Sequence, residues 1–205
     1  GIWAWSDSTI QQIQNESLQS HAMDNTVVGI TEWLGNTWVT TESSLMQFAD
    51  QTFLERQALE NIREISSDGR SMWLRTDDSI HYVTPSDTTE YETPSTPTSI
   101  AASGLTVCVG TEDGLFRLWK GRTGDQMWED PLGAQDHDVN ITSVLGDDRG
   151  GCWMAGEDGT IGYIDKDGFA TWWHLPNPDP PTIDQLILDR GQVWVLTEEG
   201  AWLLW

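Results

Sequence analysis

An all-β fold is predicted by three features of the sequence: an internal repeat, a regular alternation of short apolar runs with turn residues, and the near absence of helical periodicity. The repeat is marked by an anchor residue, usually Trp, and successive anchors are 35, 35, 35, 45 and 41 residues apart. Repeats of this length are typical of supersecondary units that stack or repeat around an axis. The anchors are Trp3, Trp38, Trp73, Cys108, Trp153 and Trp194.

The register of the repeat extends well beyond the anchor. The fourth residue after every anchor is acidic, and the sixth is small. An Ile or Leu precedes the anchor by eight residues in five of the six copies. Agreement at so many offsets indicates that every copy forms the same structural unit. The acidic residues are Asp7, Glu42, Asp77, Glu112, Glu157 and Glu198, and the aliphatic residues are Ile30, Ile65, Ile100, Leu145 and Leu186.

The fifth copy shows what one unit is expected to contain. Turn sequences rich in Asp and Gly separate its four short apolar runs, because Asp bonds to nearby backbone and Gly accepts a positive φ. Glu157-Asp158-Gly159 holds an Asp-Gly pair, the strongest short-range signal for a β-hairpin. Residues 165–168 indicate a plain β-turn, since they lack the third oxygen ligand and the late Glu of a calcium loop. The expected strands are residues 141–145, 152–155, 160–164 and 169–174.

Four short strands in each of six copies predict a β-propeller with about six blades of antiparallel strands. Residues 52–62 are expected to form a fourth strand followed by a loop, with a helical turn as the alternative. Residues 84–98 are rich in Pro, Ser and Thr and predict an exposed, extended loop. We expect a single domain whose blade equivalents are residues 1–26, 27–60, 61–96, 97–136, 137–181 and 182–205.

The anchors have a physical role in such a fold. Side chains alternate between the two faces of a strand, so one face of each blade must fill the gap to its neighbour. A Trp side chain does this well, since it buries on the order of 200 Å². We therefore interpret the anchors as core packing rather than as an aromatic ligand cage, and expect Trp38, Trp73, Trp153 and Trp194 to be largely buried. The aliphatic residue eight positions earlier is expected to face the same layer.

Two cysteines, Cys108 and Cys152, are too few for a disulfide-rich scaffold. Cys108 is itself an anchor, and Cys152 directly precedes one. If the anchors point toward the following blade, the two cysteines face each other, and if the anchors point backward, the cysteines face apart. We expect free, buried thiols, because Cys is among the most often buried residue types.

The formal net charge is −23, from 33 acidic and 10 basic residues. This balance argues against nucleic-acid binding, which needs clustered Lys and Arg, and against adhesion to anionic lipid. Two interpretations stay open: a highly soluble acidic surface, as in a salt-rich or extracytoplasmic setting, or a surface complementary to a basic partner protein. The sequence shows neither a membrane-spanning apolar run nor the spacing of a catalytic, cofactor or metal site, so we expect no cofactor.

Several copies resemble known propeller repeats. Asp147-Asp148-Arg149-Gly150-Gly151-Cys152-Trp153 resembles the repeat of two-component-regulator propellers, in which Asp-x-x-Gly leads into a Trp strand. Glu112-Asp113-Gly114 through Trp119, followed by Thr123-Gly124, is similar to a WD repeat. The first three copies depart from both, since they lack the Gly and carry Ser or Thr at the sixth position. The first resemblance implies extracytoplasmic sensing, the second a scaffold for partner proteins, and neither supplies catalytic residues.

We therefore expect a non-enzymatic propeller that acts as an interaction or scaffold subunit of a larger assembly. The alternative is an extracytoplasmic ligand-sensing domain, and a periplasmic or extracellular location is favoured. The first copy starts at its second strand and the sixth stops at its third, so we expect other residues or a partner subunit to complete the ring by adding to an open strand edge. The candidate pairing edge is Trp202, Leu203, Leu204 and Trp205.

Overall fold

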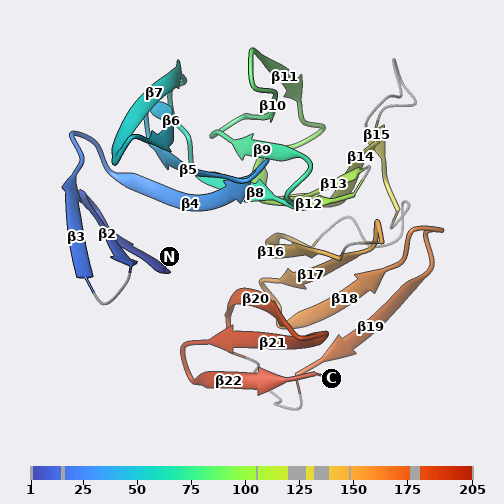
Figure 1. The fold of residues 1–205 in the computed structure, drawn as a ribbon. Coiled ribbons are helices and arrows are strands. Elements are labelled where there is room, and N and C mark those ends of the chain that lie inside the picture. The colour runs from blue at the N-terminus through green and yellow to red at the C-terminus, as the bar shows by residue number, and fades with distance from the viewer. Residues whose placement is uncertain are drawn as a thin grey trace. The chain divides into compact units, whose positions relative to one another are not determined.

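The fold is all-β, as predicted. Every regular element is a strand in the described part of the chain, and consecutive strands form six sheets (Figure 1). The chain divides into two compact units, Gly1–Asp77 with His81–Glu90 and Asp78–Ile80 with Tyr91–Trp205. The single domain and its blade limits stay a prediction. The computed structural model describes residues 2–14, 17–104, 106–119, 128–131, 139–147, 149–175 and 181–204.

Unit 1 holds the first two sheets and most of the third. The first sheet has three strands in the order β1-β2-β3, while the second and third have four, in the orders β4-β5-β6-β7 and β11-β10-β9-β8. Residues 52–62 form a strand and a loop, as expected, rather than a helical turn. The strands are β1 (Ile2–Ser6), β2 (Thr9–Gln14), β3 (Ser17–Ala22), β4 (Val27–Trp33), β5 (Asn36–Thr41), β6 (Ser44–Ala49), β7 (Thr52–Ala58), β8 (Glu64–Ser67), β9 (Met72–Arg75), β10 (Ser79–Val83) and β11 (Thr88–Glu92).

Unit 2 holds the fourth, fifth and sixth sheets. The fourth and fifth have four strands each, and the sixth has three in the order β20-β21-β22. The strands are β12 (Pro97–Ser103), β13 (Thr106–Thr111), β14 (Gly114–Trp119), β15 (Trp128–Glu129), β16 (Ile141–Gly146), β17 (Cys152–Gly156), β18 (Thr160–Ile164), β19 (Ala170–His174), β20 (Ile183–Asp189), β21 (Gln192–Thr197) and β22 (Gly200–Leu203).

The exposed loop predicted for residues 84–98 is wrong in two stretches of its length. Thr88–Glu92 forms β11, and Pro97 already belongs to β12. The β-branched and aromatic side chains of Thr88, Thr89 and Tyr91 favour a strand more strongly than the flanking Pro and Ser residues favour a loop. A short turn leads into β11: the Thr84 N–H donates to the Asp87 carbonyl oxygen (2.8 Å), and the Asp87 N–H donates to the Thr84 hydroxyl (3.0 Å).

Consecutive sheets within a unit pack face to face, and the anchors point toward the following sheet. In unit 1, Trp38 of the second sheet belongs to a buried cluster with Met72 and Leu74 of the third. In unit 2, Trp153 of the fifth sheet packs with Leu186 and Val195 of the sixth. The forward direction was one of the two alternatives that the sequence left open, and it decides where the cysteines lie.

The aliphatic residue eight positions before the anchor does not generally share the anchor's face. Ile30 and Leu186 pair across their sheets with Val39 and Val195, the residues that follow the anchors, so they face the preceding sheet. Leu145 alone of the five pairs with its anchor, Trp153. The fifth sheet differs because five residues lie between its paired ends Gly146 and Cys152, whereas the corresponding turns of the other sheets hold an even number.

Candidate functional site

The site candidate is the set of turns that join each anchor strand to the next strand, called here the plus-four turns because they contain the acidic residue four positions after the anchor. Their backbone is fixed by a bond that recurs in three sheets. The N–H of the acidic residue donates to the carbonyl oxygen of the residue that directly precedes the first strand of the same sheet. The carboxylate of the acidic residue stays exposed. These bonds run from Glu42 to Thr26 (3.1 Å), from Glu112 to Thr96 (3.1 Å) and from Glu157 to Asn140 (2.9 Å).

Hydroxyl side chains close the turns from within. The hydroxyl of Thr41 accepts a hydrogen bond from the Ser44 N–H (3.1 Å), and the hydroxyl of Thr111 donates to the Gly114 carbonyl oxygen (2.9 Å). Thr197 does the same toward Gly200 (3.2 Å). The Thr that precedes the acidic residue therefore shapes the turn, and the carboxylate itself is not needed for that purpose.

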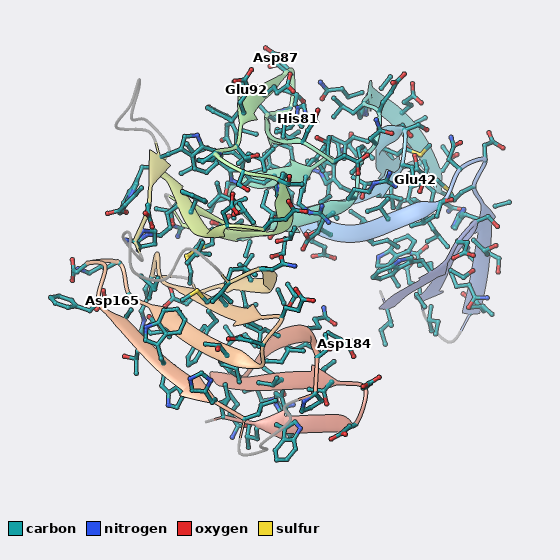
Figure 2. All side chains as sticks on the ribbon, turned by 180° about the vertical axis from the view of Figure 1, so that it is seen from behind. Glu42, His81, Asp87, Glu92, Asp165 and Asp184 are labelled. Carbon is teal, nitrogen blue, oxygen red and sulfur yellow. A yellow bond between two sulfur atoms is a disulfide. The ribbon has the colours of Figure 1, made fainter. Side chains whose placement is uncertain are left out.

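The plus-four turns carry carboxylates and no Lys or Arg. Among the described loops at the same sheet ends, Arg63 is the one basic residue. The turns at the other ends hold Arg70, Arg149, Lys166 and Arg190. In Figure 2, Asp165 marks the turn between β18 and β19, which lies at one of these other ends in unit 2. The carboxylates of the plus-four turns are Asp7, Glu42, Asp77, Asp78, Glu112, Asp113, Glu157, Asp158, Glu198 and Glu199.

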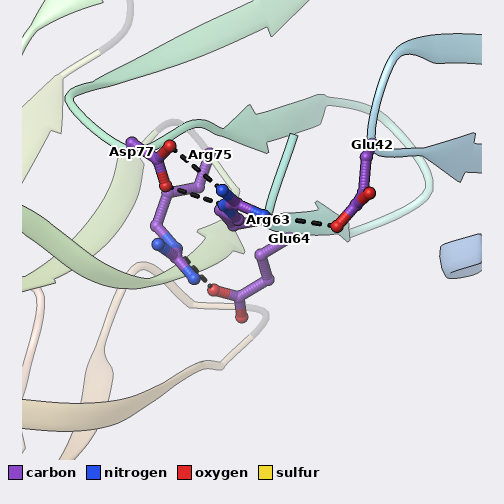
Figure 3. A network of polar contacts seen from close by, with 5 residues as sticks. All are labelled: Glu42, Arg63, Glu64, Arg75 and Asp77. Atoms are coloured by element: carbon purple, nitrogen blue, oxygen red, sulfur yellow. Dashed lines mark hydrogen bonds and ion pairs between the residues drawn. The ribbon is translucent and has the colours of Figure 1, made fainter. Parts of the chain in front are cut away.

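Arg63 links two plus-four turns within unit 1 (Figure 3). Its Nε and Nη2 donate to the two carboxylate oxygens of Asp77, at 2.7 and 3.1 Å, and its Nη1 lies 3.3 Å from Glu42 Oε1. The hydrogen bond from Arg63 lowers the pKa of Asp77, and the same contact raises the pKa of Arg63. A second ion pair joins Arg75 Nε to Glu64 Oε2 at 3.1 Å across β8 and β9.

In unit 2 the corresponding place is hollow, and no described Lys or Arg bridges Glu112 and Glu157 there. Two cavities of about 280 and 270 Å³ share Val139 and Asp158 in their walls, and Glu112 and Glu157 line the first of them. The Asn140 side-chain amide donates to Glu157 Oε2 (3.1 Å). In the second cavity the Thr160 hydroxyl donates to Asp158 Oδ2 (2.8 Å). In the described residues no cluster of three or more His, Cys, Asp or Glu side chains has the geometry of a metal site.

The two cysteines form a disulfide, and the expectation of free thiols is wrong. Cys108 lies on β13 and Cys152 on β17, and both are fully buried. Their Cα atoms are 6.2 Å apart, within the range that a disulfide requires. The reason is the forward direction of the anchors: Cys108 points from the fourth sheet to the fifth, and Cys152, one position before Trp153, points back to the fourth.

The anchors differ in how deeply they are buried. Trp38 and Trp73 keep 5 % and 1 % of their surface exposed. Trp153, which stacks on Trp173 at 5.4 Å between ring centroids, and Trp194 are only partly buried, less than expected. Trp194 lies on the side of the sixth sheet opposite to Val195, which packs on the fifth. The role of the anchors as packing residues stays a prediction, which substitution of Trp38 tests.

The candidate pairing edge lies at the end of the sixth sheet. β22 is an outer strand that pairs with β21, and Trp202 and Leu203 are 37 % and 48 % exposed. Leu204 instead packs onto the buried cluster between the fifth and sixth sheets. Trp205 is outside the described residues. Completion of a ring at this edge stays a prediction.

One buried charged residue was not predicted from the sequence. Arg117 on β14 is fully buried, its Nη2 lies 2.9 Å from Glu129 Oε2, and its Nη1 donates to the Asp165 carbonyl oxygen (2.7 Å). The bond to Asp165 ties the fourth sheet to the turn between β18 and β19 of the fifth. The available signal was an Arg between Phe116 and Leu118 in an otherwise apolar strand. A buried Arg of this kind requires a partner that cannot be identified from one sequence.

No protein-family profile and no curated protein sequence matches the chain. Solved structures do. A catalytically inactive virginiamycin B lyase from Staphylococcus aureus, solved with quinupristin, superposes with a TM-score of 0.76 at 15 % identity, over 95 % of this chain and 72 % of that one. The extracellular domain of BT4673 from B. thetaiotaomicron, described as a hybrid two-component system, gives 0.73 at 17 % identity, over 98 % and 30 %. BBS1N in complex with ARL6DN gives 0.72 at 11 % identity, over 98 % and 72 %.

These similarities establish the fold and nothing finer, because sequence identity is low throughout. The neighbours are a lyase, an extracellular domain and a chain solved with a protein partner. This chain spans 72 % of the lyase and 30 % of the BT4673 domain. In the described part of the chain, no helix is both long and apolar enough to span a bilayer. The chain therefore has a β-propeller fold, and in each of its sheets an acidic turn follows the anchor strand.

Proposed function

We propose that the chain is a non-enzymatic propeller subunit that binds a basic partner protein through its plus-four turns. The observation that carries this proposal is the segregation of the basic residues: the plus-four turns hold carboxylates and no Lys or Arg, and four of the five basic residues in the described turns and loops lie at the other sheet ends, Arg63 being the exception. A surface that was acidic only for solubility would need no such segregation. An acidic face steers a basic partner during encounter and disfavours acidic ones.

The geometry supports a pre-formed surface. The backbone bonds from Glu42, Glu112 and Glu157 hold the turns in place before any partner arrives, and pre-organisation reduces the entropy lost on binding. In unit 1 Arg63 already neutralises part of the charge at Glu42 and Asp77. In unit 2 no described basic residue does so at Glu112 or Glu157, so the strongest attraction is expected there.

The test compares two variants with the same change in net charge. Glu112→Gln, Glu157→Gln and Glu198→Gln together remove one negative charge from each of three plus-four turns of unit 2. A matched triple variant, Asp50→Asn with Asp167→Asn and Asp189→Asn, neutralises exposed carboxylates at other sheet ends. Binding of a labelled oligo-arginine peptide is measured by fluorescence anisotropy at low and at physiological salt, with oligo-glutamate as the negative control. We expect the first variant to bind several-fold more weakly and the second to bind like the unmodified chain. Equal weakening in both would leave only a diffuse acidic surface and would end the proposal.

A second candidate function, an extracytoplasmic ligand-sensing domain, is favoured by the disulfide. Disulfides persist in secreted and periplasmic proteins and are rare in the cytosol of most organisms. The bond joins two fully buried residues 44 positions apart, so it belongs to the packed interior of unit 2. Alkylation of the protein in cells of its source, followed by mass measurement after denaturation, gives its redox state. A cross-linked chain supports this candidate, while two alkylated thiols would favour a cytosolic scaffold.

A further inference from the structure

Exposed apolar side chains are concentrated in the first and the sixth sheet, which are the first and the last along the sequence. Eleven large hydrophobic residues are exposed in the described part of the chain, and eight of them belong to the first or the sixth sheet. Scattered exposed hydrophobics are ordinary in soluble proteins, but contiguous patches mark interaction surfaces. The eight are Ile2, Trp5, Ile13, Leu18, Ile187, Leu188, Trp202 and Leu203.

In the first sheet, three of these residues form a row across all three strands. Ile2 pairs with Ile13, and Ile13 pairs with Leu18. They are 68 %, 47 % and 60 % exposed. The neighbouring Trp3 packs edge-on against Phe48 of the second sheet at 4.9 Å between centroids. Because adjacent residues point to opposite faces, the row Ile2–Ile13–Leu18, called here the first-sheet face, points away from the second sheet.

The sixth sheet carries a matching row. Trp194 pairs with Ile187 on one side and with Leu203 on the other. Val193 and Val195, which flank Trp194 on its strand, are 3 % and 0 % exposed, and Val195 packs against the fifth sheet. The row Ile187–Trp194–Leu203, called here the sixth-sheet face, therefore points away from the fifth sheet.

Both sheets are poor in charged residues, although the chain is highly charged. The strands β1, β2 and β3 contain no Asp, Glu, Lys or Arg, although 21 % of all residues are charged. The strands of the sixth sheet contain only two, Asp184 and Asp189. Depletion of charged residues is the compositional mark of the core of an interface. It also means that two such faces meet without the repulsion that the net charge of −23 would otherwise impose.

The side chains of the two faces are complementary in the same way as those of sheets that already pack together within a unit. Where sheets pack within a unit, an anchor Trp meets aliphatic side chains of the next sheet, as Trp153 meets Ile183 and Leu186. The sixth-sheet face offers an anchor, Trp194, and the first-sheet face offers three aliphatic side chains. All three residues of the first-sheet face are exposed, as are Ile187 and Leu203 of the sixth-sheet face, and Trp194 is partly buried. We propose that the sixth-sheet face of one copy packs against the first-sheet face of a second copy, in a head-to-tail contact between unlike surfaces.

The experiment uses one substitution on each face. Leu18→Asp changes the first-sheet face and Leu203→Asp the sixth-sheet face, and both side chains are about half exposed, so the fold is expected to survive. Ile2→Asp serves as a second variant on the first-sheet face, and Phe169→Asp, at a 75 % exposed residue in a turn outside both faces, is the control. Mass in solution is measured by sedimentation and light scattering across a range of concentrations, and circular dichroism checks the fold.

We expect the unmodified chain and the control to associate, and each face variant alone to remain at the mass of one chain. Burying a charge in place of Leu should weaken the contact by more than about tenfold. A mixture of the two face variants should recover a two-chain species, because each supplies the intact face that the other lacks. A chain that stays single at every concentration would overturn the proposal, since the faces are then covered in some other way. Association that persists in both variants, or that fails to recover in the mixture, would overturn it as well.

Discussion

Breaking the disulfide in unit 2 should measurably lower the thermal stability of the protein. The cross-link closes a segment with a sequence separation of 44 between Cys108 and Cys152. In the chain-entropy description, closing a loop of that length stabilises the folded state by about 4 kcal/mol. For proteins of this size each kcal/mol shifts Tm by roughly 2–4 °C. Reduction should therefore lower Tm by roughly 8–16 °C.

Calorimetry of the protein with and without a phosphine reductant measures this shift. The double variant Cys108→Ala with Cys152→Ala is the control, because it lacks the bond and its Tm should not respond to the reductant. Comparing the two pairs of scans separates the cross-link from the packing of the sulfur atoms. If the denatured, unreduced protein titrates with two free thiols, or if reduction leaves Tm unchanged, the reasoning from the forward-pointing anchors fails.

Three further outcomes are expected. Trp38→Ala should lower the free energy of unfolding, measured in urea, by about 3–5 kcal/mol through lost burial and a cavity, whereas Phe169→Ala should change it by less than about 0.5 kcal/mol; equal effects would deny the anchor a packing role. Because Arg63 lowers the pKa of Asp77, this pair stabilises the fold above the ordinary Asp range and the contribution is lost as pH falls through the lowered pKa. Arg63→Gln should move the NMR titration of the Asp77 carboxyl to higher pH, and an unmoved curve would contradict the bonds drawn in Figure 3. Burial, with a smaller contribution from Asp147, raises the pKa of Tyr163 from 10.0 to about 12, so its contribution to stability is complete below pH 10 and is lost as pH rises toward 12; ultraviolet titration of Tyr163→Phe should lack this late ionisation.

The repeat made most of the fold predictable. Anchor spacing and Asp-Gly turns are local signals, and the strands around Trp38, Trp153 and Trp194 lie where those signals place them. The strand Thr88–Glu92 is not predictable from composition, because Pro and Ser on both sides of its adjacent Thr residues are typical of a loop. Local signals did not predict which neighbouring sheet the anchors face, because that direction depends on how two sheets pack and not on any single strand.

The site was harder to predict than the fold for the same reason. The acidic register was visible, but its meaning depends on Arg63, which lies outside the register and reaches two turns at once. The disulfide followed from the forward direction of the anchors, one of two arrangements that the sequence allowed equally. Buried Arg117 required its partners Glu129 and Asp165 to be known, and both come from outside its own strand.

The five residues between Gly146 and Cys152 have a consequence for how this chain can change in length. With an odd number of turn residues, a side chain at a given distance before the anchor points to the opposite side of the sheet from its counterpart in a sheet with an even turn. Leu145 therefore points toward the sixth sheet, whereas Ile30, its counterpart in the second sheet, points toward the first. A single inserted or deleted residue in any of these turns would move a whole strand's apolar side chains to the wrong side. Changes of two residues would preserve them. Length variation among related chains should therefore occur in even steps at these turns, and an odd step should be accompanied by substitutions along the entire inner strand.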